Sequence, residues 1–406
     1  MNCRHCNENL DLTLVNLGVC PPSNAYLKKE DLDKPETFYP LEVLVCEKCW
    51  LVQTKDFNKE DELFTSDYAY FSSFSTSWLK HCENFVNTSI ERFDLTEESK
   101  FVEVAANDGY LLKFVKDRGI PCYGVEPTNS TANAAREKGI EIVEEFFGVD
   151  LATKLVNDGG SADFTCAKNV LAHVPDINDF VAGFEKLLKP EGVCTFEFPH
   201  LYELISNNQF DTIYHEHYSY LSLLSVKTIF EKNGLTIFDV AQLPTHGGSL
   251  RVFAQKTTTG NKQIEASVAN LLAQEVEAGM NNVDYYKNFE RSAKKVKDDF
   301  LEFLIKHSDK KIVGYGAAAK GNTLLNYGGV KHDSIDFVVD RSPSKIGKYL
   351  PGSRIRVATE EELKSEKPDY VVIFPWNLKT EIEGQLSYIR EWGGRFVTAV
   401  PELSIF

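Results

Sequence analysis

The stretch FVEVAANDGYLLKFVKDRGIPCYGVEPT, residues 101–128, decides the fold of the central part of the chain. Its apolar pattern predicts a buried strand at Phe101–Ala105, a turn at Ala106–Gly109, a helix, and a second strand at Tyr123–Glu126. Strand, helix and parallel strand in this order form the repeating unit of doubly wound α/β proteins. We therefore expect an α/β protein with a Rossmann-type domain at this point.

The turn of this unit indicates what it binds. In doubly wound folds a cofactor lies over the first turn, and an acid at the end of the second strand, here Glu126, binds the ribose hydroxyls. The turn reads E-x-A-x-N-D-G and holds one glycine, too few for close backbone approach to a pyrophosphate. This favours a nucleoside without phosphates, as in S-adenosylmethionine. A βαβ unit without a ligand is the alternative.

The sheet is expected to continue downstream of this unit. A strand predicted at 163–167 is followed by Asn169 and His173, which lie at its carboxyl end, where open α/β sheets bind their ligands. A helix at Ile177–Leu188 and a strand at Val193–Phe198 follow. Polar residues near the cofactor are therefore expected from two strand ends.

Two C-x2-C pairs lie in the first fifty residues, Cys3 with Cys6 and Cys46 with Cys49, separated by 39 residues. Each pair can direct two thiolates at one ion, and two pairs complete a tetrahedral zinc site. Because all four ligands come from the protein, we expect a structural Zn2+ that folds a small domain and no catalysis at the metal. Four unrelated reduced thiols are the alternative.

Composition bounds the function class. The chain has 406 residues, a formal net charge of -16 and an odd count of nine cysteines, which is no disulfide framework. So acidic a protein repels nucleic acid and anionic membranes. The N-terminus has no signal segment, and no apolar run is as long as a membrane span. We expect a cytoplasmic monomer without nucleic-acid or membrane partners.

The stretch FDTIYHEHYSYLSL, residues 210–223, has the composition of a proton-transfer site. It places Tyr214, His215, Glu216 and His217 in succession, and imidazole is the natural base near pH 7. Side chains alternate between the two faces of a strand, so Tyr214 and Glu216 would point away from His217 if this segment were a strand. A shared site therefore requires an irregular loop here.

Three further segments flank this stretch. Residues 68–81, YAYFSSFSTSWLKH, combine hydroxyls and aromatics that suit a sugar or phosphate pocket, or else a helix N-cap with its core anchors. THGGSLRVFAQK, residues 245–256, reads as a loop closing over a ligand, with His246 and Arg251 beside two glycines, and then an edge strand. Residues 261–307 predict a charged helical pair without chemistry.

A second α/β unit begins at Lys311. KIVGYGAAAKGNTLLNY predicts strand, Gly-rich turn and helix, and the turn with Lys320 can hold a phosphate through backbone N–H groups and the ammonium. It is not a P-loop, because the lysine precedes glycine and asparagine. A dinucleotide is the rival ligand, and Asp340 at the end of the second strand would then bind its ribose.

Eight motifs occur together in one order: the two C-x2-C pairs, YAYFSSFSTSWLKH, EVAANDGYLL, NVLAHVPD, IYHEHYSYL, HGGSLR and YGAAAKGNTLLN. Across essentially the whole chain this resembles the S-adenosylmethionine-dependent sugar C-3'-methyltransferases of tetronitrose- and mycarose-type deoxyhexoses. The resemblance implies a zinc-binding domain at 1–65 and a class I methyltransferase domain of Rossmann type at 66–260. It also implies a second Rossmann-like α/β domain at 261–406 that helps to bind a nucleotide-linked keto-deoxysugar.

Two positions depart from the family pattern. The first turn reads V-A-A-N-D-G where the family often has a glycine and a cysteine before N-D-G. The loop reads Y-H-E-H where an aspartate often replaces His215. We therefore expect His215 to be a surface residue without a role.

The resemblance implies roles for matching residues. Those expected at the cofactor are Glu103, Asn107, Asp108, Gly109, Glu126, Asn169 and His173. Those expected at the sugar nucleotide are Tyr70, Ser72, Ser73, His81, Arg251, Lys320 and Asn322, with Asp340, Arg341 and Lys345 near the base or pyrophosphate. Arg251 and Lys320 would supply the local positive charge that a diphosphate requires.

The implied reaction is methylation of C-3' of a 4-keto-6-deoxyhexose through an enolate. A general base must remove the C-3 proton, and a donor should stabilise the oxyanion. We expect His217 to be the base and Glu216 to orient a ring or bind a sugar hydroxyl. Tyr214 and His173 are expected to hydrogen-bond the ketone or the base. The rival classes are a nicotinamide-dependent sugar-nucleotide enzyme and a zinc-ribbon protein that binds nucleic acid.

Overall fold

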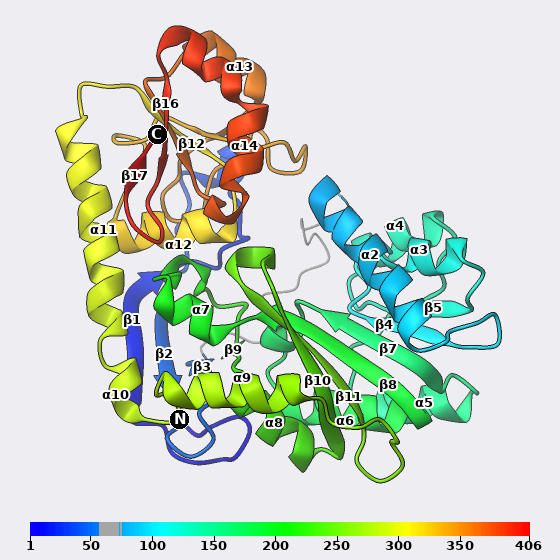
Figure 1. The fold of residues 1–406 in the computed structure, drawn as a ribbon. Coiled ribbons are helices and arrows are strands. Elements are labelled where there is room, and N and C mark those ends of the chain that lie inside the picture. The colour runs from blue at the N-terminus through cyan, green and yellow to red at the C-terminus, as the bar shows by residue number, and fades with distance from the viewer. Residues whose placement is uncertain (57–72, 74) are drawn as a thin grey trace.

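The computed structural model describes residues 1–56, 73 and 75–406, and these residues form three β-sheets with helices around them (Figure 1). The strands are β1 (Leu12–Cys20), β2 (Tyr39–Val45), β3 (Val52–Thr54), β4 (Phe101–Val104), β5 (Cys122–Val125), β6 (Ile142–Val143), β7 (Ala162–Lys168), β8 (Leu188–Pro199), β9 (Ser219–Tyr220), β10 (Leu235–Leu243), β11 (Ser249–Lys256), β12 (Ile312–Tyr315), β13 (Val338–Val339), β14 (Val357–Ala358), β15 (Tyr370–Ile373), β16 (Arg395–Thr398) and β17 (Ser404–Ile405). The expected α/β class is confirmed.

The helices alternate with these strands. They are α2 (Thr76–Arg92), α3 (Leu112–Asp117), α4 (Asn129–Glu137), α5 (Val149–Asn157), α6 (Ile177–Leu187), α7 (Leu201–Ser206), α8 (Leu223–Lys232), α9 (Ala266–Glu277), α10 (Val283–Tyr286), α11 (Phe289–Lys306), α12 (Ala319–Gly328), α13 (Glu360–Glu366) and α14 (Lys379–Gln385). The expected helical pair after residue 260 is α9 and α11, with short α10 between them. Within the described residues, no helix has the length and apolar character needed to cross a membrane.

The first sheet is antiparallel and has the order β1-β2-β3-β9. Its first three strands come from the N-terminal fifty-odd residues, but β9 comes from the histidine-rich stretch and pairs Tyr220 with Val52. A segment far along the chain thus completes the N-terminal sheet. The conformation of the histidine-rich stretch therefore depends on this sheet.

The four paired cysteines meet at one end of this sheet. Their sulfur atoms all lie within 4.8 Å of one another, with Cys3 Sγ 3.6 Å from Cys49 Sγ and Cys6 Sγ 3.5 Å from Cys46 Sγ. Zinc–sulfur bonds of about 2.3 Å in a tetrahedron require sulfur–sulfur distances of about 3.8 Å. The thiol set therefore fits a closed four-cysteine zinc site, as expected.

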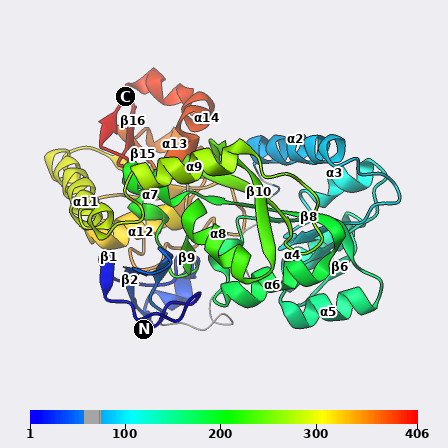
Figure 2. The same ribbon diagram turned by 60° about the horizontal axis from the view of Figure 1, so that its bottom comes forward.

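The central sheet has the order β10-β11-β8-β7-β4-β5-β6. Strands β8, β7, β4, β5 and β6 are parallel, and β11 is antiparallel to both of its neighbours. Alternate side chains of β4 face opposite layers: Phe101 packs with residues of α2 and α3, and Val104 packs with residues of α6 and α8. Figure 2 shows these helices on the two sides of the sheet.

The third sheet has the order β14-β13-β12-β15-β16-β17, with all strands parallel except β17. It repeats the strand–turn–helix unit of the central sheet, with β12, a Gly-rich turn and α12. Helix α11 runs from α10 beside the first sheet towards this third sheet (Figure 1). The two Rossmann-like units thus share one molecule with the zinc-bearing sheet.

The turn after β4 shows the structural consequence of one departure from the family pattern. Ala105 has φ 59° and Asn107 has φ 48°, both in the left-handed region. Asparagine tolerates this region, but a Cβ there costs roughly 1–2 kcal/mol for other residues. Ala105 occupies the position at which the family often has glycine, so this chain carries local backbone strain in the turn.

We predict that Ala105→Gly stabilises the protein by up to about 1 kcal/mol, because relief of the left-handed strain outweighs the added freedom of the unfolded chain. Denaturant unfolding measures the change. Ala106→Gly is the matched control: Ala106 is fully buried and lies outside the left-handed region, so its replacement should destabilise. Equal losses in both variants would contradict the assignment of strain to Ala105.

We predict that Cys46→Ser lowers the zinc content from about one ion per chain and lowers the melting temperature, because three thiolates hold the ion poorly and the β2–β3 connection loses its support. Plasma mass spectrometry and thermal unfolding provide the two measurements. Cys122→Ser, in the central sheet, should keep the full zinc content. An unchanged zinc content in Cys46→Ser would refute the four-ligand site.

Candidate active site

The histidine-rich stretch is an irregular loop between two short elements. A 3-10 helix, η4 (Phe210–Thr212), precedes it, and β9 follows it. The amide of His217 donates to the carbonyl of Tyr214 across 2.9 Å, which closes a turn. The rings of Tyr214 and His217 lie 4.0 Å apart between centroids. The predicted irregular loop is confirmed, and it brings together side chains that a strand would separate.

The His217 ring is fixed in one tautomer. Its Nδ1 lies 2.8 Å from the carbonyl oxygen of Thr212, which can only accept, so Nδ1 carries the proton and Nε2 keeps its lone pair. Burial, with nearby His173 and the charge of Lys320, holds the pKa of His217 well below its usual range. A neutral imidazole with an available basic nitrogen results.

His173 lies against His217, with ring centroids 4.6 Å apart at a steep angle. It ends the 3-10 helix η3 (Leu171–His173), which follows β7. Burial lowers the pKa of His173 to about 4, so this imidazole is also neutral. The loop after β7 and the histidine-rich loop therefore meet at these two rings.

Glu216 is 2% exposed, and burial raises the pKa of its carboxyl to about 7. The side-chain amide of Asn24 donates to both of its carboxylate oxygens, at 2.8 Å each. The ring of His217 is oriented by the carbonyl of Thr212, so that task does not fall to Glu216. Sequence reasoning missed Asn24, which lies in a connection of the first sheet.

His215 is not on the surface, and the expectation for it is wrong. It is 4% exposed, and its Nε2 lies 3.1 Å from the carbonyl of Pro40 in β2. Its ring meets that of Tyr39 edge-on, with centroids 6.0 Å apart. His215 thus joins the loop to the first sheet through this hydrogen bond and this ring contact.

The candidate cofactor residues surround the turn after β4. The Glu126 carboxylate accepts from the amide of Asn107 at 2.9 Å and from that of Thr128 at 3.0 Å. Asp108 accepts from Lys138 at 3.0 Å and from the hydroxyl of Ser73. These contacts hold the turn in shape before any ligand arrives.

Two further candidate residues, one in β4 and one in the turn, pack against the protein interior. Glu103 is fully buried, and burial raises the pKa of its carboxyl well above the usual range. Gly109 has φ 72°, and a Cβ there would lie 3.1 Å from the Cβ of Ala135 in α4. Both positions therefore support the turn from the protein side.

Asn169 lies past the end of β7, as expected, with φ 53°. Its amide donates to Nε2 of His246 across 3.0 Å. Trp78 contacts both His246 and His81, with ring centroids 5.2 Å and 5.0 Å away. Trp78 was not among the predicted site residues, and His246 was noted only as part of a closing loop. The two glycines after His246 were the sequence signal that could have identified it as a site residue.

Arg251 and His81 are engaged within the protein. Both donate to the buried Glu197 carboxylate, Arg251 at 2.9 Å and His81 at 2.7 Å, and Lys168 completes the cluster. Burial would raise the pKa of Glu197, but the charge of Lys168, the hydrogen bond from His81 and the charge of Arg251 hold it well below the usual range. Arg251 is only 12% exposed. The motif search missed Glu197, which is paired with Arg251 across β8 and β11.

The Gly-rich turn after β12 is braced like the turn after β4. Asp340 accepts from the amides of Ala317 and Ser342, each at 2.8 Å. Lys345 donates to the carbonyl of Ala317 across 2.7 Å. Arg341 is exposed and pairs with Glu360 at 3.2 Å. Asp340 and Lys345 thus shape the turn, and Arg341 lies at its outer side.

Lys320 points from α12 towards the histidine-rich loop. Its ammonium donates to Asn377 across 2.8 Å and lies 4.3 Å from the centre of the Trp376 ring. Burial lowers its pKa to about 8, against the opposing charge of Asp211. Trp376 in turn donates to the Asp211 carboxylate at 2.7 Å. Asp211, Trp376 and Asn377 extend the predicted set.

Three predicted residues remain. Asn322 is buried, and its amide donates to the carbonyl of Ser23 across 2.7 Å, so it joins α12 to the first sheet's connection. Tyr70 and Ser72 lie outside the described residues.

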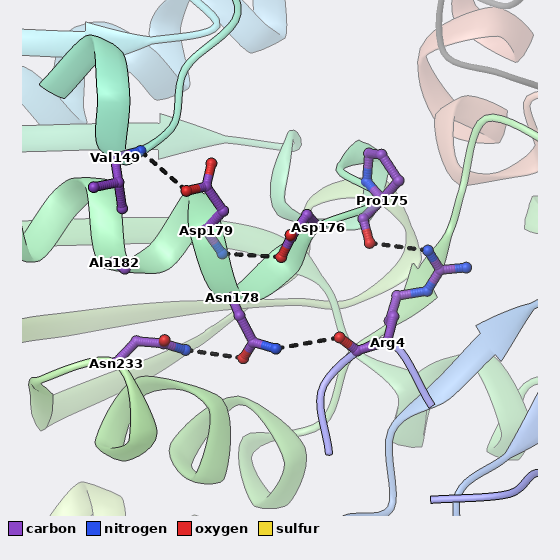
Figure 3. A pocket seen from close by; sticks show the side chains of 8 residues that line it. All are labelled: Arg4, Val149, Pro175, Asp176, Asn178, Asp179, Ala182 and Asn233. Carbon is purple, nitrogen blue, oxygen red and sulfur yellow. Dashed lines mark hydrogen bonds between the residues drawn. The ribbon is translucent and has the colours of Figure 1, made fainter. Parts of the chain in front are cut away.

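A surface hollow of about 650 Å³ lies at the first C-x2-C turn (Figure 3). Its lining residues are Arg4, Val149, Pro175, Asp176, Asn178, Asp179, Ala182 and Asn233. Arg4 donates to the carbonyl of Pro175, and Asn178 donates to the carbonyl of Arg4. None of the predicted site residues lines this hollow, and we assign it no chemistry.

Comparison with family models matches three consecutive parts of the chain. Residues 3–64 match a zinc binding domain, residues 78–240 a methyltransferase domain and residues 244–401 a C-methyltransferase C-terminal domain. The chain is 35% identical over 402 residues to C-methyltransferase NovU of Streptomyces niveus. The aligned residues cover 98% of this chain and 95% of that relative.

Solved structures resemble the central part at low sequence identity. An S-adenosylmethionine-dependent methyltransferase from Clostridium acetobutylicum is 13% identical and has a TM-score of 0.36. The match covers 45% of this chain and 92% of that chain. Magnesium protoporphyrin IX methyltransferase from Synechocystis PCC 6803 is 13% identical, covers 50% and 86%, and has a TM-score of 0.35. Scores at this level carry no argument of their own.

The relative that spans the whole chain decides the assignment, together with the three family models. The three family models fall on the four-cysteine zinc site, the central sheet and the second α/β sheet described above. This chain belongs to the C-methyltransferase family and is an S-adenosylmethionine-dependent enzyme with a zinc site.

Proposed function

We propose that the enzyme methylates C-3' of a nucleotide-linked 4-keto-6-deoxyhexose through an enolate, in the biosynthesis of a branched-chain deoxysugar. The observation that carries the proposal is the His217 ring, which is neutral and offers Nε2 as a base within the same loop as Tyr214 and Glu216. Methylation at carbon requires a carbon nucleophile, and a ketone makes the neighbouring C–H acidic enough for an imidazole to remove the proton.

His217 removes the proton from C-3 through Nε2, and the electron pair of that C–H bond moves into the ketone to give an enolate. Tyr214, whose ring lies against His217, donates a hydrogen bond to the enolate oxygen, and Glu216 binds a hydroxyl of the sugar. S-Adenosylmethionine supplies the electrophilic methyl group when bound. The enolate electron pair would form the new bond from C-3 to the methyl group as the sulfur–methyl bond breaks, S-adenosylhomocysteine would be the leaving group, and His217 would end the step protonated.

The residues around the first turn would hold the cofactor. Glu126 stands at the end of β5, where the ribose hydroxyls of a nucleoside are bound in such folds. Asn107, Asp108 and Asn169 surround the same turn and the neighbouring strand end. The turn holds a single glycine, Gly109, which suits a nucleoside because no glycine-rich approach to phosphates is required.

The Gly-rich turn after β12 would hold the diphosphate of the nucleotide sugar. Its backbone is braced by Asp340, and Lys320 presents a buried ammonium that contacts an amide oxygen and an aromatic ring. Such a cation gains strongly from an anionic ligand in a low-dielectric site. Lys320 also faces the histidine-rich loop, which suits a sugar placed between diphosphate and base.

We predict that His217→Asn reduces methyl transfer to a 4-keto nucleotide sugar by roughly 10²–10⁴-fold, the usual contribution of a general base. Exchange of the C-3 hydrogen for deuterium, followed by mass spectrometry, should fall in parallel. The affinity for S-adenosylhomocysteine should stay within about twofold of the wild type. Residue 217 lies outside the first turn, and asparagine is close in size to the part of the imidazole nearest the backbone.

His215→Asn is the matched control for this prediction. It removes a buried imidazole from the same loop, yet its partner is the carbonyl of Pro40. The variant should lose stability and keep deuterium exchange. Near-normal exchange and methyl transfer in His217→Asn would sink the base assignment.

We predict that kcat/KM for the nucleotide sugar declines above pH 8, because Lys320, with a pKa of about 8 in the free enzyme, loses the charge that attracts the diphosphate. At about one pH unit or more below this pKa the ammonium form is nearly complete, and kcat/KM should be level on this account. Lys320→Met should lower kcat/KM by roughly tenfold or more and remove the alkaline decline. A decline that persists unchanged in Lys320→Met would rule out this group as its source.

A further inference from the structure

The connection between β1 and β2 reaches away from the zinc site and into the centre of the molecule. The carbonyl of Ser23 accepts from Asn322, and the Tyr26 hydroxyl donates to the carbonyl of Ala317 across 2.6 Å. Leu27 pairs with Tyr349 through two backbone hydrogen bonds of 2.9 Å and 2.8 Å. This segment, residues 23–27, is thereby fixed against the Gly-rich turn and α12.

Asn24 lies in the middle of this fixed segment and points the other way, at the histidine-rich loop. Its side-chain nitrogen is 2.8 Å from Oε1 and 2.8 Å from Oε2 of Glu216. Glu216 is one residue before His217 in the turn closed by the Tyr214 carbonyl. The contact therefore joins the N-terminal part of the chain to the residue beside the proposed base.

The chemistry of this contact suits a positioning role. A buried carboxylate needs hydrogen-bond donors, and bonds that involve a charged group are stronger than neutral ones. A lysine or arginine at this point would neutralise Glu216 and compete with a ligand for its oxygens. An asparagine amide orients the carboxylate and adds no charge, which leaves the remaining lone pairs of both oxygens for a hydroxyl group.

We propose that Asn24 is a positioning residue that holds the Glu216 carboxylate in the orientation in which it binds a hydroxyl of the sugar. The zinc-bearing part of the chain then contributes directly to the geometry of the active site. This inference rests on the proposed function and names a residue that acts through Glu216 without touching the substrate's reacting atoms.

A double-mutant cycle tests the inference. Asn24→Ala should lower kcat/KM for the nucleotide sugar by roughly tenfold, the size expected for a hydrogen bond to a charged group. In the Glu216→Ala background the same change should cost less than about twofold, because the carboxylate that Asn24 orients is absent. If the two single losses in kcat/KM multiply in the double variant, the proposal is overturned. A merely structural role of Asn24 would add its free-energy cost independently of Glu216.

Three measurements separate this role from a folding defect. Zinc content, affinity for S-adenosylhomocysteine and melting temperature should stay close to those of the wild type in Asn24→Ala. Asn16→Ala, an exposed asparagine in β1 of the same sheet, should keep full activity. If Asn24→Ala does not fold, Asn24→Ser replaces it in the cycle: its hydroxyl keeps a donor, so it should recover part of the activity.

The outcome distinguishes the two levels of the argument. A wild-type enzyme that shows neither methyl transfer nor C-3 exchange with 4-keto nucleotide sugars overturns the proposed function. An active wild type with an unchanged Asn24→Ala, or with multiplying losses, overturns only the role of Asn24.

Discussion

The pairing of β9 with β3 is the constraint on which the active site depends. It adds residues 219–220 to the N-terminal sheet, and Thr54 at the end of β3 bonds the carbonyls of His217 and Tyr218. On the other side, the amide of Tyr218 donates to the carbonyl of Ala172 in η3, across 2.8 Å. The loop that carries His217 is thus held between the zinc-bearing sheet and the central sheet. A zinc ion held in part by Cys46 and Cys49 would fix the β2–β3 turn, next to the strand that pairs with β9.

The two Rossmann-like units prepare their turns by the same device. In each, the acid that ends the second strand accepts backbone amides of the first turn and of its own loop: Glu126 from Asn107 and Thr128, and Asp340 from Ala317 and Ser342. A carboxylate used in this way orders a turn that otherwise has unpaired N–H groups. Both turns are therefore held in shape by contacts within the protein, and a ligand that binds at either turn would meet a preorganised backbone.

Local patterns predicted much of this fold. The strands at 101–104 and 122–125, α6 and the four-cysteine site follow from periodicity and paired spacing, because such signals lie within a few residues of one another. The pairing of β9 with β3 does not, since it joins segments more than 160 residues apart. The contact of His215 with Pro40 and the ion pair of Arg251 with Glu197 across β11 and β8 likewise join segments that are distant in the sequence. Sequence reasoning found the residue types of the site and missed several partners that hold them.

Three partly buried imidazoles lie near one another, and their hydrogen bonds distinguish them. Burial lowers the pKa of His173, His217 and His246 alike, so each is neutral. His246 already uses Nε2 to accept from Asn169. His217 donates through Nδ1 to the carbonyl of Thr212, which leaves Nε2 without a proton, and the ring of Tyr214 lies against that of His217. If His217 acts as the proposed base, the proton it takes would create a cation near the positive charge of Lys320, and the repulsion would favour release of that proton. That repulsion supports a base that is reset in each turnover, and it argues against a permanently charged histidine at this position.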